Sequence, residues 1–280
     1  MRIAIKTNPQ NTTWQALREM WVVADGIEVF DTAWSFDHFY PIVSDSTGPC
    51  LEGWTTLAAL AEATERIRVG LLVSGMPYRH PAVLANMASA VDIVSGGRLE
   101  LGLGAGWNEQ EASAYGIDLG RSLTERFDMF DEGVEAVLGL LTDETTTFHG
   151  RHVDLTEARN SPKAIQSPRP PLTIGGTGEK RTLRTVARFA DHWNLPWGTI
   201  DEWNHKRGVL ADHCAAIGRD PSEILNSTML RVDANDLGAV AEEAQRWHEA
   251  GLGMVIFLLS PPYDPALLES LAALADPLRS

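Results

Sequence analysis

The sequence predicts a closed α/β barrel of eight parallel strands, and two observations support this fold class. First, the apolar residues alternate about eight times between strand-like and helix-like spacing, which is typical of a parallel sheet covered by helices. Second, the chain has 280 residues, of which 44% are hydrophobic, and a barrel of about 250 residues forms one domain. We therefore expect a single domain over residues 1–280, with an insertion at about 142–170 after the fourth strand.

Each of the first four strands is followed by a stretch with helical spacing of apolar residues. We expect these strands at residues 2–6, 27–34, 67–73 and 98–103. The helices that follow them are expected at residues 13–24, 57–66, 81–94 and 123–141. Pro81 stands where the first turn of a helix tolerates proline, and Gly96 with Gly97 forms a stop signal.

The rhythm resumes after an irregular middle segment. The insertion contains turn residues and short strand-like pieces such as GRHVDL. The remaining strands are expected at residues 171–174, 191–195, 226–232 and 254–259. Their helices are expected at residues 180–189, 200–217, 237–250 and 265–275.

Composition narrows the classes of partner. The formal net charge is −15, and a surface of that sign repels phosphate backbones and anionic headgroups, so neither nucleic acid nor a membrane is expected as a partner. Cys50 and Cys214 have no CxxC spacing, and the sequence contains no HExxH, so no metal site is expected. No segment reaches the ~18 apolar residues of a membrane span. We expect a soluble, cytoplasmic protein that acts on a small molecule.

The stretch RLELGLGAGWNEQ, residues 98–110, superficially matches a dinucleotide-binding signature. In the pattern G-x-G-x-x-G, the third glycine would fall on Trp107 or Glu109, so both registers fail. What remains is Gly102, Gly104 and Gly106 on one face of a strand. Bare backbone there either lets a flat ligand approach or allows tight packing inside the barrel. Barrel enzymes place their sites at the carboxyl ends of strands, which favours the ligand.

A second glycine cluster lies in LTIGGTGEKRTL, where Gly175, Gly176, Thr177 and Gly178 follow a strand and open a helix. Backbone N–H groups at a helix N-terminus attract anions, so this loop is a candidate phosphate site. The alternative is a plain glycine turn with a helix cap. Together the two loops indicate one ligand with a planar head and a phosphate.

The stretch SFDHFYP places Asp37 and His38 after the second strand. An imidazole there can donate or accept a proton at neutral pH, although a histidine taken alone is more often structural. Trp107, Trp193 and Trp197 also fall near strand ends. They are candidates to stack on a ring or to fill the barrel mouth, and for Trp193 we favour filling.

With DHF at 37–39, RLELGLGAGWNE at 98–109 and PPLTIGGTGEKRTLR at 170–184, the chain resembles the bacterial luciferase-like superfamily. More narrowly, it is similar to the coenzyme F420-dependent oxidoreductases of that superfamily. The likeness covers nearly the whole chain and weakens after about residue 200. It implies a TIM-type barrel with an insertion and coenzyme F420 as cofactor, with FMN as the alternative. Dimers are common in the family, so a homodimer is the partner that the resemblance allows.

The resemblance also implies site residues. Leu72, Val73 and Ser74 take the place of a non-proline peptide, often cis, that bulges against the back face of the ring. His38 is the catalytic candidate. The cofactor-binding candidates are Asp37, His38, Leu72, Val73, Ser74, Gly104, Ala105, Gly106, Trp107, Asn108, Gly175, Gly176, Thr177 and Gly178, the last four for the phosphate.

Two positions depart from the sugar-phosphate dehydrogenases of this group. Those enzymes have, directly after the glycine run, a glutamate that acts as an acid, whereas this chain has Trp107 there. They also have a tryptophan shortly after HF-x-P, where this chain has Ile42. Their substrate and proton chemistry therefore should not be carried over, and His38 and Lys6 are the retained polar groups.

Three functions follow as hypotheses. The leading one is hydride transfer between the deazaflavin and a small organic substrate, with the protein supplying orientation and electrostatics. The close alternative is an FMN-dependent monooxygenase that uses a separate reductase. The alternative of another class is a non-catalytic flavin- or deazaflavin-binding protein.

Overall fold

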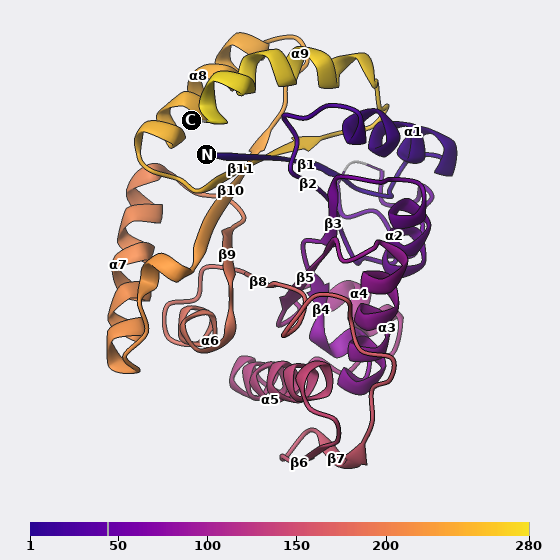
Figure 1. Cartoon of the computed structure of the whole chain (residues 1–280), viewed down its shortest axis with the longest axis vertical. Helices are drawn as coiled ribbons and strands as arrows, with labels where there is room; N and C mark the ends of the chain where they lie inside the picture. Colours follow the sequence, from indigo (N-terminus) through magenta and orange to yellow (C-terminus); the bar gives the residue numbers. More distant parts are fainter. Residues whose placement is uncertain (44, 280) are drawn as a thin grey trace.

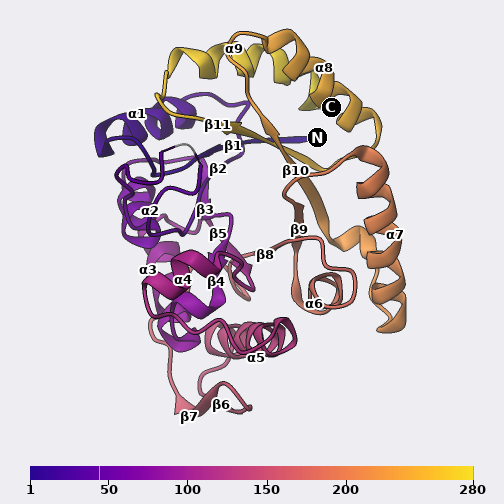
Figure 2. The ribbon, with the colours of Figure 1, turned by 180° about the vertical axis from the view of Figure 1, so that it is seen from behind.

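The computed structural model describes residues 1–43 and 45–279, in which parallel strands close into a barrel surrounded by helices (Figures 1 and 2). The barrel strands are β1 (Arg2–Thr7), β2 (Thr32–Ser35), β3 (Arg68–Leu71), β5 (Leu99–Gly104), β8 (Leu172–Gly175), β9 (His192–Leu195), β10 (Leu225–Arg231) and β11 (Met254–Leu259). Pairing of β3 with β5 closes the sheet. After a short bulge, β3 continues as β4 (Ser74–Gly75), which also pairs with β5. The predicted eight-stranded barrel is confirmed.

The outer helices follow the strands in the predicted order. They are α1 (Trp14–Asp25), α2 (Gly53–Glu62), α3 (Pro81–Val94), α5 (Leu123–Thr142), α6 (Thr182–Phe189), α7 (Ile200–Ala216), α8 (Leu237–Glu249) and α9 (Ala266–Ala275). Short turns of 3-10 helix are η1 (Met76–Tyr78), η2 (Pro221–Glu223) and η3 (Asp276–Arg279). Within the described ranges, no helix combines the length and apolar character needed to span a bilayer.

Local chemistry shifts two predicted boundaries. The second strand is predicted from residue 27 but begins at Thr32. The Phe30 N–H donates to the Ile27 carbonyl, so residues 27–30 form a turn instead of a strand. The second helix is predicted from residue 57 but begins at Gly53. The Glu52 side chain accepts the first free N–H groups of that helix, which moves the start toward the N-terminus.

The insertion and one short helix complete the fold. The insertion contains an antiparallel hairpin of β6 (Thr146–His149) and β7 (Asp154–Ala158). The Glu132 carboxylate of α5 accepts three backbone N–H groups from the loop of that hairpin. The sequence patterns do not predict α4 (Glu109–Ala114), which directly follows the glycine run.

The strands divide the interior into two apolar regions. Alternate residues of β1 point to opposite sides of the barrel wall. Ile3 and Ile5 join the large core beneath the helices, whereas Ala4 joins a smaller cluster with Trp34 and Met229. Because the smaller cluster lies on the inward face of the strands, it fills part of the barrel lumen.

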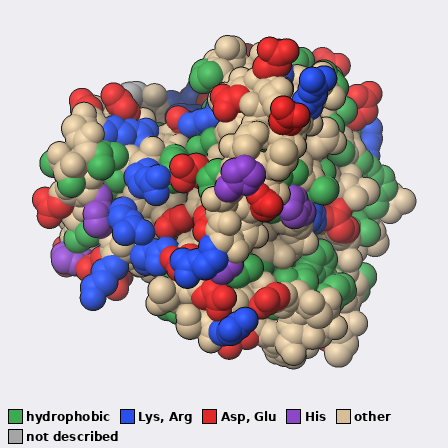
Figure 3. Space-filling view, turned by 90° about the horizontal axis from the view of Figure 1, so that it is seen from below, with side chains coloured by type: hydrophobic (Ala, Val, Ile, Leu, Met, Phe, Trp, Pro, Cys, Tyr) green, Lys and Arg blue, Asp and Glu red, His purple; other side chains and the backbone are tan. Residues whose placement is uncertain are grey.

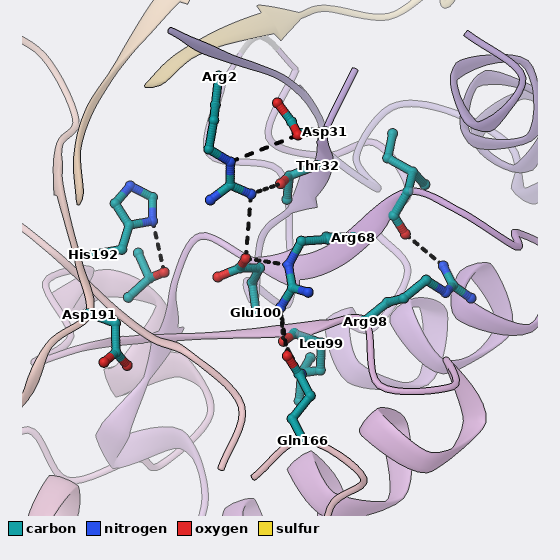
Figure 4. Close-up of polar contacts among 12 residues, drawn as sticks. Arg2, Asp31, Thr32, Arg68, Arg98, Leu99, Glu100, Gln166, Asp191 and His192 are labelled. Carbon is teal, nitrogen blue, oxygen red and sulfur yellow. Dashed lines mark hydrogen bonds and ion pairs between the residues drawn. The ribbon is translucent and has the colours of Figure 1, made fainter. Parts of the chain in front are cut away.

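Paired charges fill the lumen near the amino ends of the strands (Figure 4). Arg68 Nε donates to Glu100 Oε1 at 2.5 Å, and Arg68 Nη2 donates to the Gln166 amide oxygen at 2.9 Å. Arg2 donates to Thr32 Oγ1 at 3.2 Å. Glu100 is the buried charge of this group, and the half-buried arginines give it the partners without which its burial would be costly.

His192 on β9 belongs to the same region. Its ring nitrogens lie 3.0 Å from Thr173 Oγ1 and 2.6 Å from Ser227 Oγ. Burial, with the positive charge of Arg2, lowers the pKa of His192 to about 3. The imidazole is therefore neutral at physiological pH and serves the packing of the barrel interior.

The close approach of β5 to the end of β3 generates a stability prediction. A Cβ atom on Gly102 would lie 1.9 Å from the Leu71 carbonyl oxygen. The variant Gly102→Ala should therefore lose roughly 3 kcal/mol of unfolding free energy or more, because backbone must move. A Cβ atom on Gly208, on the exposed side of α7, would meet no described atom of the surrounding chain within 4 Å, so Gly208→Ala should gain up to about 1 kcal/mol. Urea unfolding of both variants checks this, and equal stabilities would contradict it.

Candidate functional site

The carboxyl ends of five strands bring the candidate residues to one mouth of the barrel. Lys6 is the penultimate residue of β1, His38 follows β2, and Val73 follows β3. The glycine run 102–106 ends β5, and the loop 175–178 follows β8. In barrels of this type the reacting groups lie at this end of the strands, so we take the mouth as the candidate site.

A backbone bulge at Leu72 and Val73 forms the floor of this mouth. The peptide bond between them is cis, as the family resemblance implies. The Leu72 N–H donates to the Ser35 carbonyl at 2.9 Å, and the Leu72 carbonyl accepts from Lys6 Nζ at 2.7 Å. Trp54 Nε1 donates to Ser74 Oγ at 2.7 Å. The bulge is therefore held from three neighbouring elements.

The Val73 side chain lies in a frame of glycines. A Cβ atom on Gly104 would approach a Val73 methyl to 2.6 Å, and one on Gly175 would approach the other methyl to 3.2 Å. The sequence predicts that the face beside Gly102 and Gly104 is open to a flat ligand. This prediction is wrong, because the bulge occupies that space. Gly106 differs, since its φ of +81° and its neighbours Pro77 and Leu119 mark a turn.

His38 is oriented by a buried carboxylate. Its Nδ1 lies 2.7 Å from Glu111 Oε2, and Glu111 is fully buried. The other carboxylate oxygen accepts the Phe39 N–H at 2.7 Å, and Tyr78 Oη donates to Oε2 at 2.7 Å. Burial alone would raise the pKa of Glu111, but hydrogen bonds from His38 and Tyr78 outweigh it and lower that pKa.

This arrangement assigns the two ring nitrogens of His38. An ionised Glu111 accepts a hydrogen bond, so Nδ1 carries the proton that it donates to the carboxylate. Among the described residues, Nε2 has no hydrogen-bond partner. A histidine fixed in this way can accept or deliver a proton at Nε2 while the carboxylate stabilises the imidazolium.

Asp37 has a different partner. Its carboxylate forms a two-pronged ion pair with Arg79, at 2.5 and 2.9 Å, and is almost fully buried. Arg79 also bonds to Glu52. This network ties the loop after β2 to the loop after η1. A direct contact of Asp37 with a cofactor stays a prediction.

Aromatic side chains form one wall of the mouth. Trp107 is 63% exposed, and its ring centroid lies 5.6 Å from that of His38. Phe39 stacks on Tyr115 at 4.7 Å and meets Tyr78 at 5.1 Å. Trp107 therefore stands beside the catalytic candidate with most of its ring facing solvent.

The glycine loop after β8 faces the mouth from another side. The Gly176 N–H donates to the Asn194 carbonyl, and Trp193 Nε1 donates to the Gly176 carbonyl at 2.8 Å. Trp193 is fully buried, but it belongs to the large core beneath the helices and does not fill the barrel mouth. Within the described residues, no backbone carbonyl accepts the N–H groups of Thr177 and Gly178, which are exposed.

Charge favours an anion at this loop. Helix α6 begins at Thr182 rather than at the predicted residue 180. Figure 3 shows Lys and Arg side chains gathered on the part of the surface where α6 and α7 lie. Exposed Lys180 lies in the approach to α6, whereas Arg184 of α6 pairs with Asp131 and Arg207 of α7 packs on Trp203. Free N–H groups and the nearby Lys180 fit a phosphate tail, and the walled mouth beside Val73 fits a planar ring.

Lys6 lies inside the barrel directly beneath the bulge. It is 7% exposed, and burial lowers its pKa from the usual value to about 7. Besides the Leu72 carbonyl, Nζ contacts Met229 Sδ at 3.8 Å. Asn108, another candidate, uses its side chain to cap α4 through the Glu111 N–H at 3.1 Å.

Sequence patterns miss the partner of His38. Glu111 lies in α4, whose six residues are too few to show a helical period. The available signal is Asn108, which is a favoured N-cap residue and is followed by two acidic residues in the first turn. That signal predicts a short helix but not its contact with a loop 73 residues away.

Other proteins of known sequence and structure are similar to this chain. The uncharacterized protein Rv0953c of Mycobacterium tuberculosis (strain ATCC 25618 / H37Rv) is 31% identical over 225 residues, which cover 78% of this chain and 75% of that protein. The uncharacterized protein Rv0940c of the same strain is 32% identical over 173 residues, which cover 59% and 57% of the two chains.

Three solved structures share the fold. An F420-dependent secondary alcohol dehydrogenase in complex with an F420–acetone adduct matches with a TM-score of 0.87 and 19% identity, covering 100% of this chain and 99% of that one. The coenzyme F420-dependent tetrahydromethanopterin reductase from Methanopyrus kandleri gives 0.83 and 16%, covering 99% and 98%. The monooxygenase RslO1 from Streptomyces bottropensis gives 0.76 and 20%, covering 100% and 98%.

A family described as luciferase-like monooxygenase matches residues 1–273. The match covers nearly the whole chain, and the barrel with its hairpin insertion agrees with it. The chain therefore belongs to the luciferase-like monooxygenase family, whose structural neighbours include F420-dependent enzymes.

Proposed function

We propose that this protein is a coenzyme F420-dependent oxidoreductase that transfers a hydride between the deazaflavin and a small, neutral organic substrate. The observation that carries the proposal is the His38 imidazole, which is fixed by buried Glu111 at 2.7 Å beside the bulge at the barrel mouth. Two structural neighbours that are F420-dependent enzymes support the choice of cofactor.

The proposal gives each part of the mouth a task. The bound deazaflavin supplies the hydride chemistry. The bulge at Val73 and the backbone at Ala105 and Gly106 would hold the ring, and the N–H groups of Thr177 and Gly178 would hold the phosphate. His38 Nε2 would donate or accept the proton that accompanies oxidation or reduction of the substrate oxygen.

The wall beside His38 favours a substrate without charge. Trp107, Phe39 and Tyr115 present aromatic surface there. Two arginines on this side are already engaged. Arg79 pairs with Asp37, and Arg126 donates to Glu109 and to the Leu119 carbonyl. With Glu111 buried behind the imidazole, an anionic substrate would meet like charge, so an alcohol or carbonyl compound fits better.

The FMN-dependent monooxygenase is the second candidate function. The family description and the likeness to RslO1 favour it. A glycine-framed bulge and a phosphate loop suit either ring, because both are planar and both carry a phosphate. A separate reductase would then supply the reduced flavin.

The first test compares the two cofactors directly. We expect the purified apoprotein to bind the deazaflavin at least about 10-fold more tightly than FMN, measured by fluorescence titration at one salt concentration. Tighter binding of FMN would favour the monooxygenase. Failure of both to bind would contradict both candidates.

The second test removes the proposed proton donor. His38→Ala should lower kcat by roughly 100-fold or more and change the cofactor Kd by less than about 3-fold, because general acid–base catalysis contributes on that scale. Steady-state kinetics on neutral alcohols and ketones, with parallel titrations, measures both. An unchanged kcat would remove His38 from the mechanism. Cofactor binding without turnover by the unmodified protein would favour the non-catalytic alternative.

The third test addresses the carboxylate behind His38. Glu111→Gln keeps the shape but removes the negative charge that stabilises the imidazolium, so kcat should fall by about 100-fold while the cofactor Kd stays the same. Glu19→Gln, on an exposed face of α1, is the matched control and should retain activity. Equal activity of the two variants would show that Glu111 does not orient the histidine.

A further inference from the structure

Lys6 is a buried cation to which the proposed chemistry assigns no task. Its side chain lies in the barrel lumen at the end of β1, and within the described residues no carboxylate comes within 4.0 Å of Nζ. An unpaired buried ammonium is costly, and replacement by an apolar side chain of similar volume is often stabilising. A lysine at this position therefore calls for a role other than stability.

The contacts of Lys6 Nζ connect it to the bulge. It donates to the Leu72 carbonyl at 2.7 Å and lies 3.8 Å from Met229 Sδ on β10. The neighbouring strands β2 and β11 present Trp34 and Leu258 in register with Lys6. The hydrogen bond to the bulge, 66 residues away in sequence, is thus the polar contact that fixes the side chain.

The other charged groups of the lumen lie toward the opposite end of the barrel. Arg2 precedes Lys6 by four residues on the same strand, a distance of about 13 Å. Glu100 pairs there with both Arg2 and Arg68, and His192 bonds to Thr173 and Ser227. Titration of Lys6 is consequently governed by its own burial, which is the cause of its lowered pKa.

We propose that Lys6 is a positioning residue that holds the Leu72 carbonyl from within the barrel and so sets the place of Val73 against the cofactor. The inference rests on the proposed function in one respect, since the bulge is taken to support the cofactor ring. The bulge has its other anchors on the Ser35 carbonyl and on Trp54. Among the side chains that the structure describes, only that of Lys6 donates to the Leu72 carbonyl, which belongs to the peptide bond between Leu72 and Val73.

A matched pair of variants separates positioning from general stability. Lys6→Met removes the donor and keeps an apolar chain of similar length. Lys163→Met is the control, because Lys163 of the insertion also donates to backbone carbonyls, those of Leu140 at 2.6 Å and Asp143 at 2.5 Å. Lys6→Met loses one lysine-to-carbonyl hydrogen bond, at the bulge, whereas Lys163→Met loses two, both away from the bulge.

The first readout uses the protein without cofactor. At pH 6.5, amide hydrogen exchange in the peptide covering residues 71–76 should be roughly 10-fold faster in Lys6→Met than in the unmodified protein, and unchanged in Lys163→Met. Unchanged exchange in Lys6→Met would overturn the proposal. This readout is independent of whether the protein binds F420, FMN or neither.

The second readout is cofactor affinity as a function of pH. Lys6→Met should weaken binding about 10-fold at pH 6, where Lys6 is charged, and by less above pH 8, where the bond comes from a neutral amine. Affinity equal to that of the unmodified protein at pH 6 would overturn the proposal. If the unmodified protein binds neither cofactor, the proposed function fails, while the exchange experiment still decides whether Lys6 holds the bulge.

The third readout is thermal stability, and its sign follows from linkage. The pKa of Lys6 is about 7 in the folded state and about 10.4 in the unfolded state, so between these values the unfolded chain binds more protons and stability rises with pH. The Tm of the unmodified protein should therefore rise relative to that of Lys6→Met between pH 6 and pH 9. A parallel pH dependence of the two proteins would show that Lys6 is not a buried, unpaired ammonium.

Discussion

The mouth of the barrel depends on one packing constraint, the seating of Val73 between glycines of two strands. Gly104 on β5 and Gly175 at the end of β8 leave the space that its two methyl groups occupy. Gly102 lets the Leu71 carbonyl approach the wall. Any side chain at these positions would push the bulge outward, and the edge where β3 meets β5 would open. Closure of the barrel and formation of the floor of the candidate site therefore both require glycine at these three positions.

Charge is distributed around this floor in a consistent manner. Buried carboxylates have donors: Glu111 has His38 and Tyr78, and Asp37 has Arg79. These pairs fix the loops that follow the strands, and they leave Nε2 of His38 without a hydrogen-bond partner among the described residues. Lys6 departs from the pattern because its partner is a carbonyl dipole rather than a carboxylate, which makes its charge sensitive to pH near neutrality.

Much of the fold could be predicted because the alternating period of apolar residues depends on neighbours a few positions apart. Boundaries were less accessible where a distant or side-chain contact decides them, as with the Glu52 cap that starts α2 early. Helix α4 was too short to show a period. The glycines of β5 are visible in the sequence, but their use was not, because the group that fills the space comes from another strand.

The sequence by itself determined the order of strands and helices, the place of the insertion, the two glycine loops and the position of His38 at a strand end. These features follow from local spacing and from residue types with restricted conformations. The tertiary structure alone decided that Glu111 lies behind His38, that Asp37 belongs to Arg79, and that Lys6 reaches the Leu72 carbonyl. Closure of the barrel produces these contacts, because it brings together strand ends that are many residues apart in the sequence. Local sequence patterns do not predict contacts over such separations.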